Sequence, residues 1–168
     1  MVPNMDLLIS AALRAMKDVV APAIPAEQGV AAEQARIVMG VLSLLQQRVS
    51  FEGARSRKEL ELAVAMAEEV ASVLSDPGAL QAELEAARSS SADVLNDKTC
   101  DAVRRSLLSC VAMSIDSEDN PEARNQLLRI VLGASAEQTS LTRAWSSPSG
   151  FEPAPADGDP LIAVLGQG

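Results

Sequence analysis

The chain has 168 residues, of which 48% are hydrophobic, and its 23 acidic and 14 basic residues give a formal net charge of −9. This length is enough for one self-sufficient domain. The acidic balance excludes a nucleic-acid binder, which would gather Lys and Arg on one face, and it opposes binding to anionic lipid.

The composition predicts an all-α fold. The apolar residues are mostly Ala, Leu and Val, Tyr is absent, and the aromatic residues are Phe51, Trp145 and Phe151. This balance favours closely packed helices over sheets. We therefore expect a mostly antiparallel bundle of six or seven helices in residues 1–145, followed by an irregular Pro/Gly-rich tail in residues 146–168.

The first helix is predicted to begin after Asn4, whose side chain is a good N-cap, and to end before Pro22 and Pro25. Apolar residues recur at helical spacing along it, and we expect this stripe to face the core. The stripe consists of Leu8, Ala12, Met16, Val19 and Val20.

The same segment indicates where the protein acts. Asp6 precedes its apolar residues, and Arg14 and Lys17 interrupt them, which is unlike a signal or transit peptide. No apolar run in the chain approaches the roughly 18 residues that a membrane span needs. We therefore expect a cytoplasmic protein without a membrane partner.

Residues 31–51 form the most hydrophobic stretch of the chain. Their apolar arc is wide, which predicts a helix at the centre of the bundle. Gly40 lies inside this helix and costs roughly 1 kcal/mol relative to alanine. A close crossing by another helix at Gly40 would explain that cost.

Capping residues divide the next part of the chain. Ser56 and Glu59 have the spacing of a capping box, which predicts that a third helix begins there and ends before Pro77. Asp76 and Pro77 are typical of the start of the next helix. The three serines at 89–91 are interpreted as a loop.

A helix over residues 98–116 carries both cysteines. Cys100 lies on its apolar stripe and Cys110 lies close to the edge of that stripe. Ten residues of helix separate the two thiols by about 15 Å, so they cannot form a disulfide with each other. We expect both to be reduced and mainly buried.

The last predicted helices follow residue 120. Asn120 and Pro121 are expected to open one helix that stops at Gly133. Ser135 and Gln138 then have the spacing of another capping box, which predicts a separate helix.

The sequence contains no histidine. This excludes Ser-His-Asp and Cys-His catalysis and the histidine-containing metal sites of helical bundles. The acidic run at residues 116–120 lacks the internal glycine and terminal glutamate of a calcium loop, so we interpret it as a helix cap. We expect no catalytic residue, metal or cofactor; an enzyme would need its carboxylates alone to carry the chemistry.

The Pro/Gly-rich tail contains a run of aliphatic residues near its end, and such a run would be sticky if it were left free. We predict that it packs in an apolar groove between helices, either of its own chain or of a second copy. Its candidate interaction residues are Leu161, Ile162, Val164 and Leu165.

Two stretches, LLISAALRAMKDVVAPAI at 7–24 and ARIVMGVLSLLQQRV at 35–49, resemble a small bacterial all-helical domain of unknown function. Such domains are fused to, or encoded beside, aminoglycoside-phosphotransferase-like kinases and acyl-CoA dehydrogenases. The resemblance rests on residues 20–23, Val-Ala-Pro-Ala, and on the Ala35-Arg36 pair. It implies a domain that accompanies another enzyme and implies no catalytic residue.

These observations leave two hypotheses for function. The first is a non-catalytic helical interaction or accessory module that forms a homo-oligomer or homodimer, or binds an enzyme encoded nearby. The second is a bundle that encloses an apolar or acyl-type ligand, with the flexible side chains of Met39, Met66 and Met113 as an adaptable lining.

Overall fold

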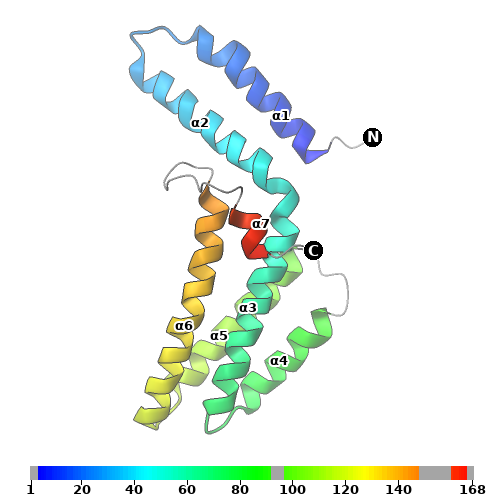
Figure 1. Ribbon diagram of the computed structural model, residues 1–168, viewed down its shortest axis with the longest axis vertical. Helices are drawn as coiled ribbons and strands as arrows, with labels where there is room; N and C mark the ends of the chain where they lie inside the picture. The colour runs from blue at the N-terminus through cyan, green and yellow to red at the C-terminus, as the bar shows by residue number, and fades with distance from the viewer. Residues whose placement is uncertain (1–3, 92–96, 148–159, 166–168) are drawn as a thin grey trace. The chain divides into compact units, whose positions relative to one another are not determined.

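The computed structural model describes residues 4–91, 97–147 and 160–165. These residues form α-helices and short π- and 3₁₀-helical turns and contain no strand, so the all-α prediction is confirmed (Figure 1). The helices are α1 (Met5–Ala15), α2 (Gly29–Arg48), α3 (Glu52–Val73), α4 (Gly78–Ser91), α5 (Asp97–Asp116), α6 (Pro121–Ser146) and α7 (Pro160–Leu165).

The chain divides into two compact units. The first comprises Met1–Phe51 and Ala144–Pro160, and the second comprises Glu52–Arg143 and Leu161–Gly168. The boundary that composition placed between residues 145 and 146 stays a prediction.

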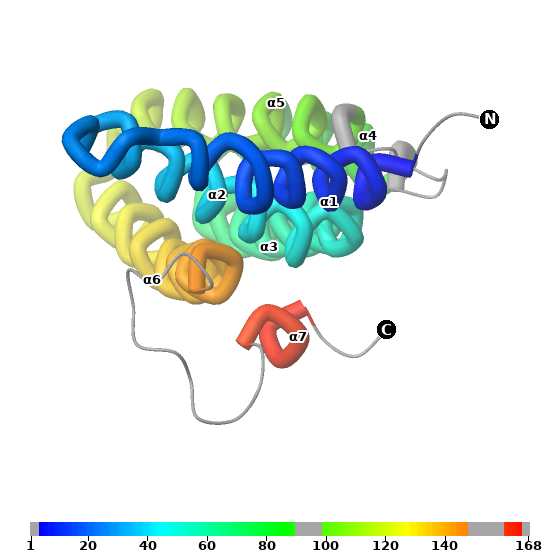
Figure 2. Tube along the Cα trace, turned by 90° about the horizontal axis from the view of Figure 1, so that it is seen from above, coloured from blue at the N-terminus to red at the C-terminus, as the bar shows by residue number. Residues whose placement is uncertain are grey.

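The first unit contains a helical hairpin. Its first helix is α1, which a π-helical turn (Met16–Val20) and a 3₁₀ turn (Ala21–Ala23) continue. Asn4 caps α1 as predicted, because its side chain accepts a hydrogen bond from the Asp6 amide at 3.3 Å. Helix α2 then returns antiparallel beside α1, as the two views agree (Figures 1 and 2).

The inner contact of the hairpin buries few residues. Ile9 of α1 and Ala35 of α2 are buried. The Gln46 side-chain amide donates a hydrogen bond to the Ser10 hydroxyl at 2.8 Å. This bond fixes the position of α1 along the axis of α2, which we call its height.

Two expectations for the hairpin are wrong. Leu8, Val19 and Val20 of the predicted α1 stripe are exposed, because α1 packs on α2 through the adjacent stripe that contains Ile9. Helix α2 is not central either, since most of its apolar residues are exposed. At Gly40 no atom of the described residues lies within 4 Å of where a Cβ would be, so none of the described helices crosses closely there.

The second unit contains α3, α4, α5 and most of α6, and within it α4, α5 and α6 each run antiparallel to the helix before them (Figure 1). The small residues Ala63 and Ala67 of α3 are buried, which lets α5 approach α3 closely. The core cluster consists of Ala63, Ala67, Val70, Leu80, Leu84, Leu107, Cys110, Val111, Ile115 and Leu127.

Polar caps fix the loops of this unit. The Asp76 carboxylate accepts the Gly78 amide at 3.0 Å, and the Asn120 side chain accepts the Glu122 amide at 2.9 Å, so both predicted caps are confirmed. Ser89 and the two serines after it lie inside α4 and not in a loop. The Ser89 hydroxyl donates to the Glu85 carbonyl, one turn earlier.

Both remaining capping-box predictions are wrong. Helix α3 begins at Glu52, so Ser56 lies within it, and Glu59 accepts a hydrogen bond from Arg55 one turn earlier. Helix α6 continues through Gly133, and the Ser135 hydroxyl donates to the Val131 carbonyl. An uninterrupted helix keeps Leu127 and Leu141 in their buried positions, and this outweighs the cost of one glycine.

The tail predicted to be irregular contains the short helix α7. Leu161 is buried, Ile162 is 46% exposed, and Val164 and Leu165 are partly buried. Their role in an interaction stays a prediction. The linker at 148–159 and the last residues, 166–168, lie outside the described part of the chain.

Candidate functional site

The hairpin carries a second apolar stripe on each helix, which we name the outer stripe. Most of its large side chains are about half exposed or more; Leu8 is 50% exposed, Val41 51% and Val30 79%. On α1 and its π-helical continuation the outer stripe consists of Met5, Leu8, Ala12, Ala15 and Val19. On α2 it consists of Val30, Val38, Val41 and Leu45, with Ile37 beside them and Gln34 as a polar member.

The outer stripe has a fixed relation to the inner contact. Leu8 comes one residue before Ile9 on α1, and Val41 comes one residue before the half-buried Leu42 on α2. Each residue turns an α-helix by about 100°. The residues of the inner contact, Ile9 on α1 and Ala35 and Leu42 on α2, form what we name the inner stripe. The outer stripe therefore lies roughly a quarter-turn from the inner stripe on both helices, in the same rotational sense.

This shared offset places both outer stripes on one face of the hairpin. Two antiparallel helices are related by an approximate twofold axis perpendicular to the layer that they form. A rotation about that axis exchanges the two helices but does not turn the layer over. Stripes with the same offset on the two helices therefore lie on the same side of the layer. The hairpin thus has one broad apolar face, which we name the outer face.

Charge is distributed unevenly between the hairpin and the rest of the chain. Residues 4–51 contain four acidic and four basic side chains, so this segment has no net formal charge, and the −9 arises from the rest of the sequence. No charged residue belongs to the outer stripe. The charged residues of the segment are Asp6, Asp18, Glu27, Glu33, Arg14, Lys17, Arg36 and Arg48.

Arg48 is the last residue of α2 and lies in the first unit. Its side chain is buried, with 1% of the residue exposed. Its Nε donates to the Trp145 carbonyl at 3.0 Å, and its terminal nitrogen donates to the Ala144 carbonyl at 3.2 Å. These carbonyls belong to the last turn of α6, where backbone acceptors lack helical partners and the helix dipole is negative. Arg48 therefore caps the C-terminus of α6.

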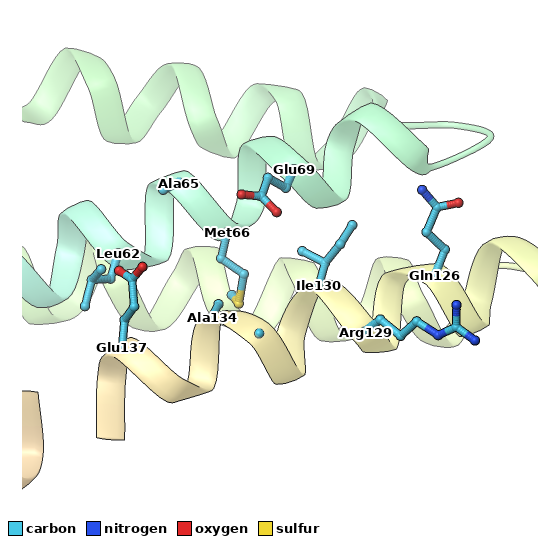
Figure 3. Close-up of a pocket in the computed structure, with 10 residues that line it drawn as sticks. Leu62, Ala65, Met66, Glu69, Gln126, Arg129, Ile130, Ala134 and Glu137 are labelled. Carbon is cyan, nitrogen blue, oxygen red and sulfur yellow. The ribbon is translucent and has the colours of Figure 1, made fainter. Parts of the chain in front are cut away.

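Among the described residues of the second unit, grooves lie along α6. One, of about 460 Å³, runs between α3, α5 and α6, and Leu108, Val111 and Ile115 of α5 line much of it. The other, of about 390 Å³, lies between α3 and α6 alone. Figure 3 shows the second groove, with the Met66 side chain reaching from α3 toward α6 and Ile130 reaching from α6 toward α3. Both grooves are partly open to solvent.

One end of the larger groove is polar, but its charges are already paired. Arg104 lies 3.5 Å from Glu59 and donates to Asp101 at 2.7 Å. The hydrogen bond from Arg104 lowers the pKa of Asp101 below its ordinary value, and the charges of Arg105 and Arg104 lower it further. This arrangement favours an uncharged apolar chain in the groove over an anionic one, which would compete with both carboxylates.

Glu118 joins two loops of the second unit. It is buried, and its carboxylate accepts hydrogen bonds from the Ser75 amide, the Ser75 hydroxyl and the Asn120 amide. The two backbone hydrogen bonds, that from Ser75 first, hold the pKa of Glu118 below its ordinary value of about 4.5. Glu118 thus connects the α3–α4 loop with the α5–α6 loop in its ionised form.

Replacing Glu118 with glutamine is expected to reduce the acid sensitivity of the fold. Because folding lowers the pKa of Glu118, its stabilisation is fully present above pH 4.5 and is lost as the pH falls through the lowered value. The variant should be less stable than wild type at pH 7, and the two should converge below pH 4.5. Urea unfolding between pH 7 and pH 3 measures this, with Glu122→Gln as control. A constant difference across that range would contradict the assignment.

Both cysteines are in the state that the sequence predicts. Cys100 and Cys110 are both free and buried, 1% and 7% exposed, which confirms that prediction. Of the three methionines expected to line a pocket, only Met66 lines the grooves, whereas Met113 is 63% exposed. Within the described residues, no group of three Cys, Asp or Glu side chains could hold a metal ion.

Comparisons with known proteins add no relative: no protein-family model, no curated protein and no solved structure matches the chain. The resemblance to a bacterial helical domain therefore stays a prediction. None of the helices in the described ranges combines the length and the apolar character that crossing a bilayer requires.

Proposed function

We propose that the protein is a non-catalytic helical interaction module that acts in the cytoplasm and self-associates, with an enzyme encoded nearby as the alternative partner. The observation that carries this proposal is the outer face of the hairpin. Two helices with one apolar face form half of a helical layer structure, and a second layer would bury that face.

The composition of the outer face supports an interaction. Monomeric proteins rarely expose a large continuous apolar patch, and such patches mark sites where proteins bind. Isolated apolar residues on a surface would carry no such meaning. Here Leu8, Val38 and Val41 belong to two stripes that share one face.

A second candidate function is binding of an uncharged aliphatic ligand along α6. The larger groove favours it, since its volume lies within the range of ligand sites and Leu108, Val111 and Met66 line it. A hydrophobic fluorescent probe tests this function. Leu108→Asp should abolish probe binding if the groove is the site, whereas Ala65→Asp, in the other groove only, should leave it intact.

Sedimentation equilibrium of the whole chain tests self-association. We expect a dimer at micromolar concentration. The predicted role of the tail is tested in the same experiment by Ile162→Asp, which alters the exposed side of α7 and leaves the buried Leu161 in place. A weakened dimer would assign α7 to the interface. A wild-type chain that remains monomeric up to about 100 μM would contradict self-association.

A further inference from the structure

We infer that the outer face binds the outer face of a second copy, so that two hairpins form an antiparallel four-helix bundle in which α1 of each copy packs on α2 of the other. This inference rests on the self-association proposed above and specifies its surface and geometry. In such a bundle each helix contacts two neighbours, through stripes separated by about a quarter-turn.

The separation of the two stripes matches this arrangement. The inner stripe of α1 is occupied by α2 of the same chain, and the outer stripe lies about 100° away from it. On α1 the outer residues Met5, Leu8 and Ala12 follow alternating spacings of three and four residues. These are the spacings at which side chains of antiparallel helices interlock.

The hydrogen bond between Gln46 and Ser10 sets the heights of the contacts. Moving forward from Ser10 along α1 corresponds to moving back from Gln46 along α2. Ala15 and Val41 therefore lie at one height, and Ala12 lies near the height of Leu45. A twofold axis parallel to the helices preserves these heights and places Ala15 of one copy opposite Val41 of the second copy.

The sizes of the side chains favour packing of α1 on α2 of the second copy over packing of α1 on α1. The middle of the α1 outer stripe is small, with Ala12 and Ala15, whereas the α2 outer stripe carries Leu45 and Val41 at the same heights. Packing α1 on α2 sets small residues against large ones, as well-packed interfaces require. Packing α1 on α1 would instead leave a gap between alanines and crowd the branched residues of α2.

Charge favours a second copy as the occupant. The hairpin has no net charge, so two hairpins do not repel each other, whereas the rest of the chain carries the entire −9. Residues of the interface core are expected to be uncharged, and this holds for every member of the outer stripe. The neighbouring helices also run antiparallel, so their dipoles oppose each other favourably.

Cross-linking between single-cysteine variants tests the geometry. The variants Ala15→Cys and Val41→Cys are prepared separately, mixed, allowed to exchange subunits and treated with a short thiol-specific cross-linker. We expect a covalent dimer from the mixture and none from either variant alone. The wild type is the control, because Cys100 and Cys110 are buried and should not react.

A charge variant tests the face independently. Val41→Glu should raise the dissociation constant of the dimer at least about tenfold, since it places a carboxylate in the apolar interface. Because Val41 is half exposed in the single chain, the variant should keep its helical circular dichroism. Ala32→Glu, on the same helix but outside both stripes, is the matched control and should leave the constant unchanged.

The outcomes separate this inference from the proposed function. A dimer that resists Val41→Glu and gives no cross-link would overturn the inference and leave self-association standing. Cross-linking of Ala15→Cys with itself would overturn the α1-on-α2 pairing. A monomeric wild type, as expected if the outer face were covered within its own chain, would overturn both.

Discussion

Replacing Arg48 with alanine is expected to lower the free energy of unfolding by about 3 kcal/mol. The side chain is buried and donates hydrogen bonds to the Trp145 and Ala144 carbonyls. Its removal leaves acceptors at the end of α6 without these donors and also leaves a cavity. Arg48→Lys should have an intermediate effect, because an ammonium keeps the charge but cannot reproduce the planar fork of donors.

Chemical denaturation of the Arg48 variants measures this loss. The matched control is Arg36→Ala on the same helix, because the Arg36 side chain is 71% exposed and its ion pair with Glu33 lies on the surface. Exposed pairs of this kind contribute at most about 1 kcal/mol. Equal losses for Arg48→Ala and Arg36→Ala would show that Arg48 is not a structural cap.

Replacing Leu107 with alanine is expected to cost about 3 kcal/mol as well, for a different reason. Leu107 is fully buried in the α3–α5 core, in the same cluster as Val70, Leu84 and Val111. Truncation removes apolar contacts and leaves a cavity that a rigid helical core fills only in part.

The control for Leu107 is Leu132→Ala on α6, which removes the same atoms from a side chain that is 71% exposed. Its effect should be below about 1 kcal/mol, because an exposed leucine has little burial to lose. Thermal unfolding of the two variants gives the comparison. A loss at Leu107 no larger than that at Leu132 would show that this core is loosely packed.

Local capping signals predicted helix starts well where a side chain alone determines the start. Asn4, Asp76 and Asn120 each accept the backbone hydrogen bond expected of them. The Ser56/Glu59 and Ser135/Gln138 pairs have the same spacing and fail, because α3 already begins at Glu52 and α6 continues through Gly133. Buried Leu127 and Leu141 lie on either side of Gly133 and hold α6 together across it.

The outer face was not predicted, although its signal is in the sequence. Adjacent apolar pairs, Leu8-Ile9, Val38-Met39 and Val41-Leu42, recur at helical spacing. Such pairs are typical of a helix with two apolar stripes, one for each neighbour. A wide apolar arc was interpreted as burial at the centre of a bundle, but hydrophobicity alone does not say whether the second neighbour belongs to the same chain.

Arg48 and Glu118 could not be identified from sequence. Each makes hydrogen bonds to backbone groups of residues far away along the chain, and backbone groups are identical at every position. A buried arginine that caps a distant helix has no local pattern. The grooves along α6 are equally inaccessible to sequence reasoning, because they depend on how closely α6 approaches α3 and α5.

The sequence separation between contacting helices determines how fast the protein is expected to fold. Helices that contact each other are consecutive in sequence, as α1 and α2 are, or separated by one helix, as α3 and α5 are. Domains with such low contact order fold in microseconds to milliseconds, because little loop-closure entropy opposes each contact. The buried Leu161 is separated from the other helices by a proline-containing linker. We therefore expect rapid formation of the helical body, followed by a distinct slower phase when α7 docks.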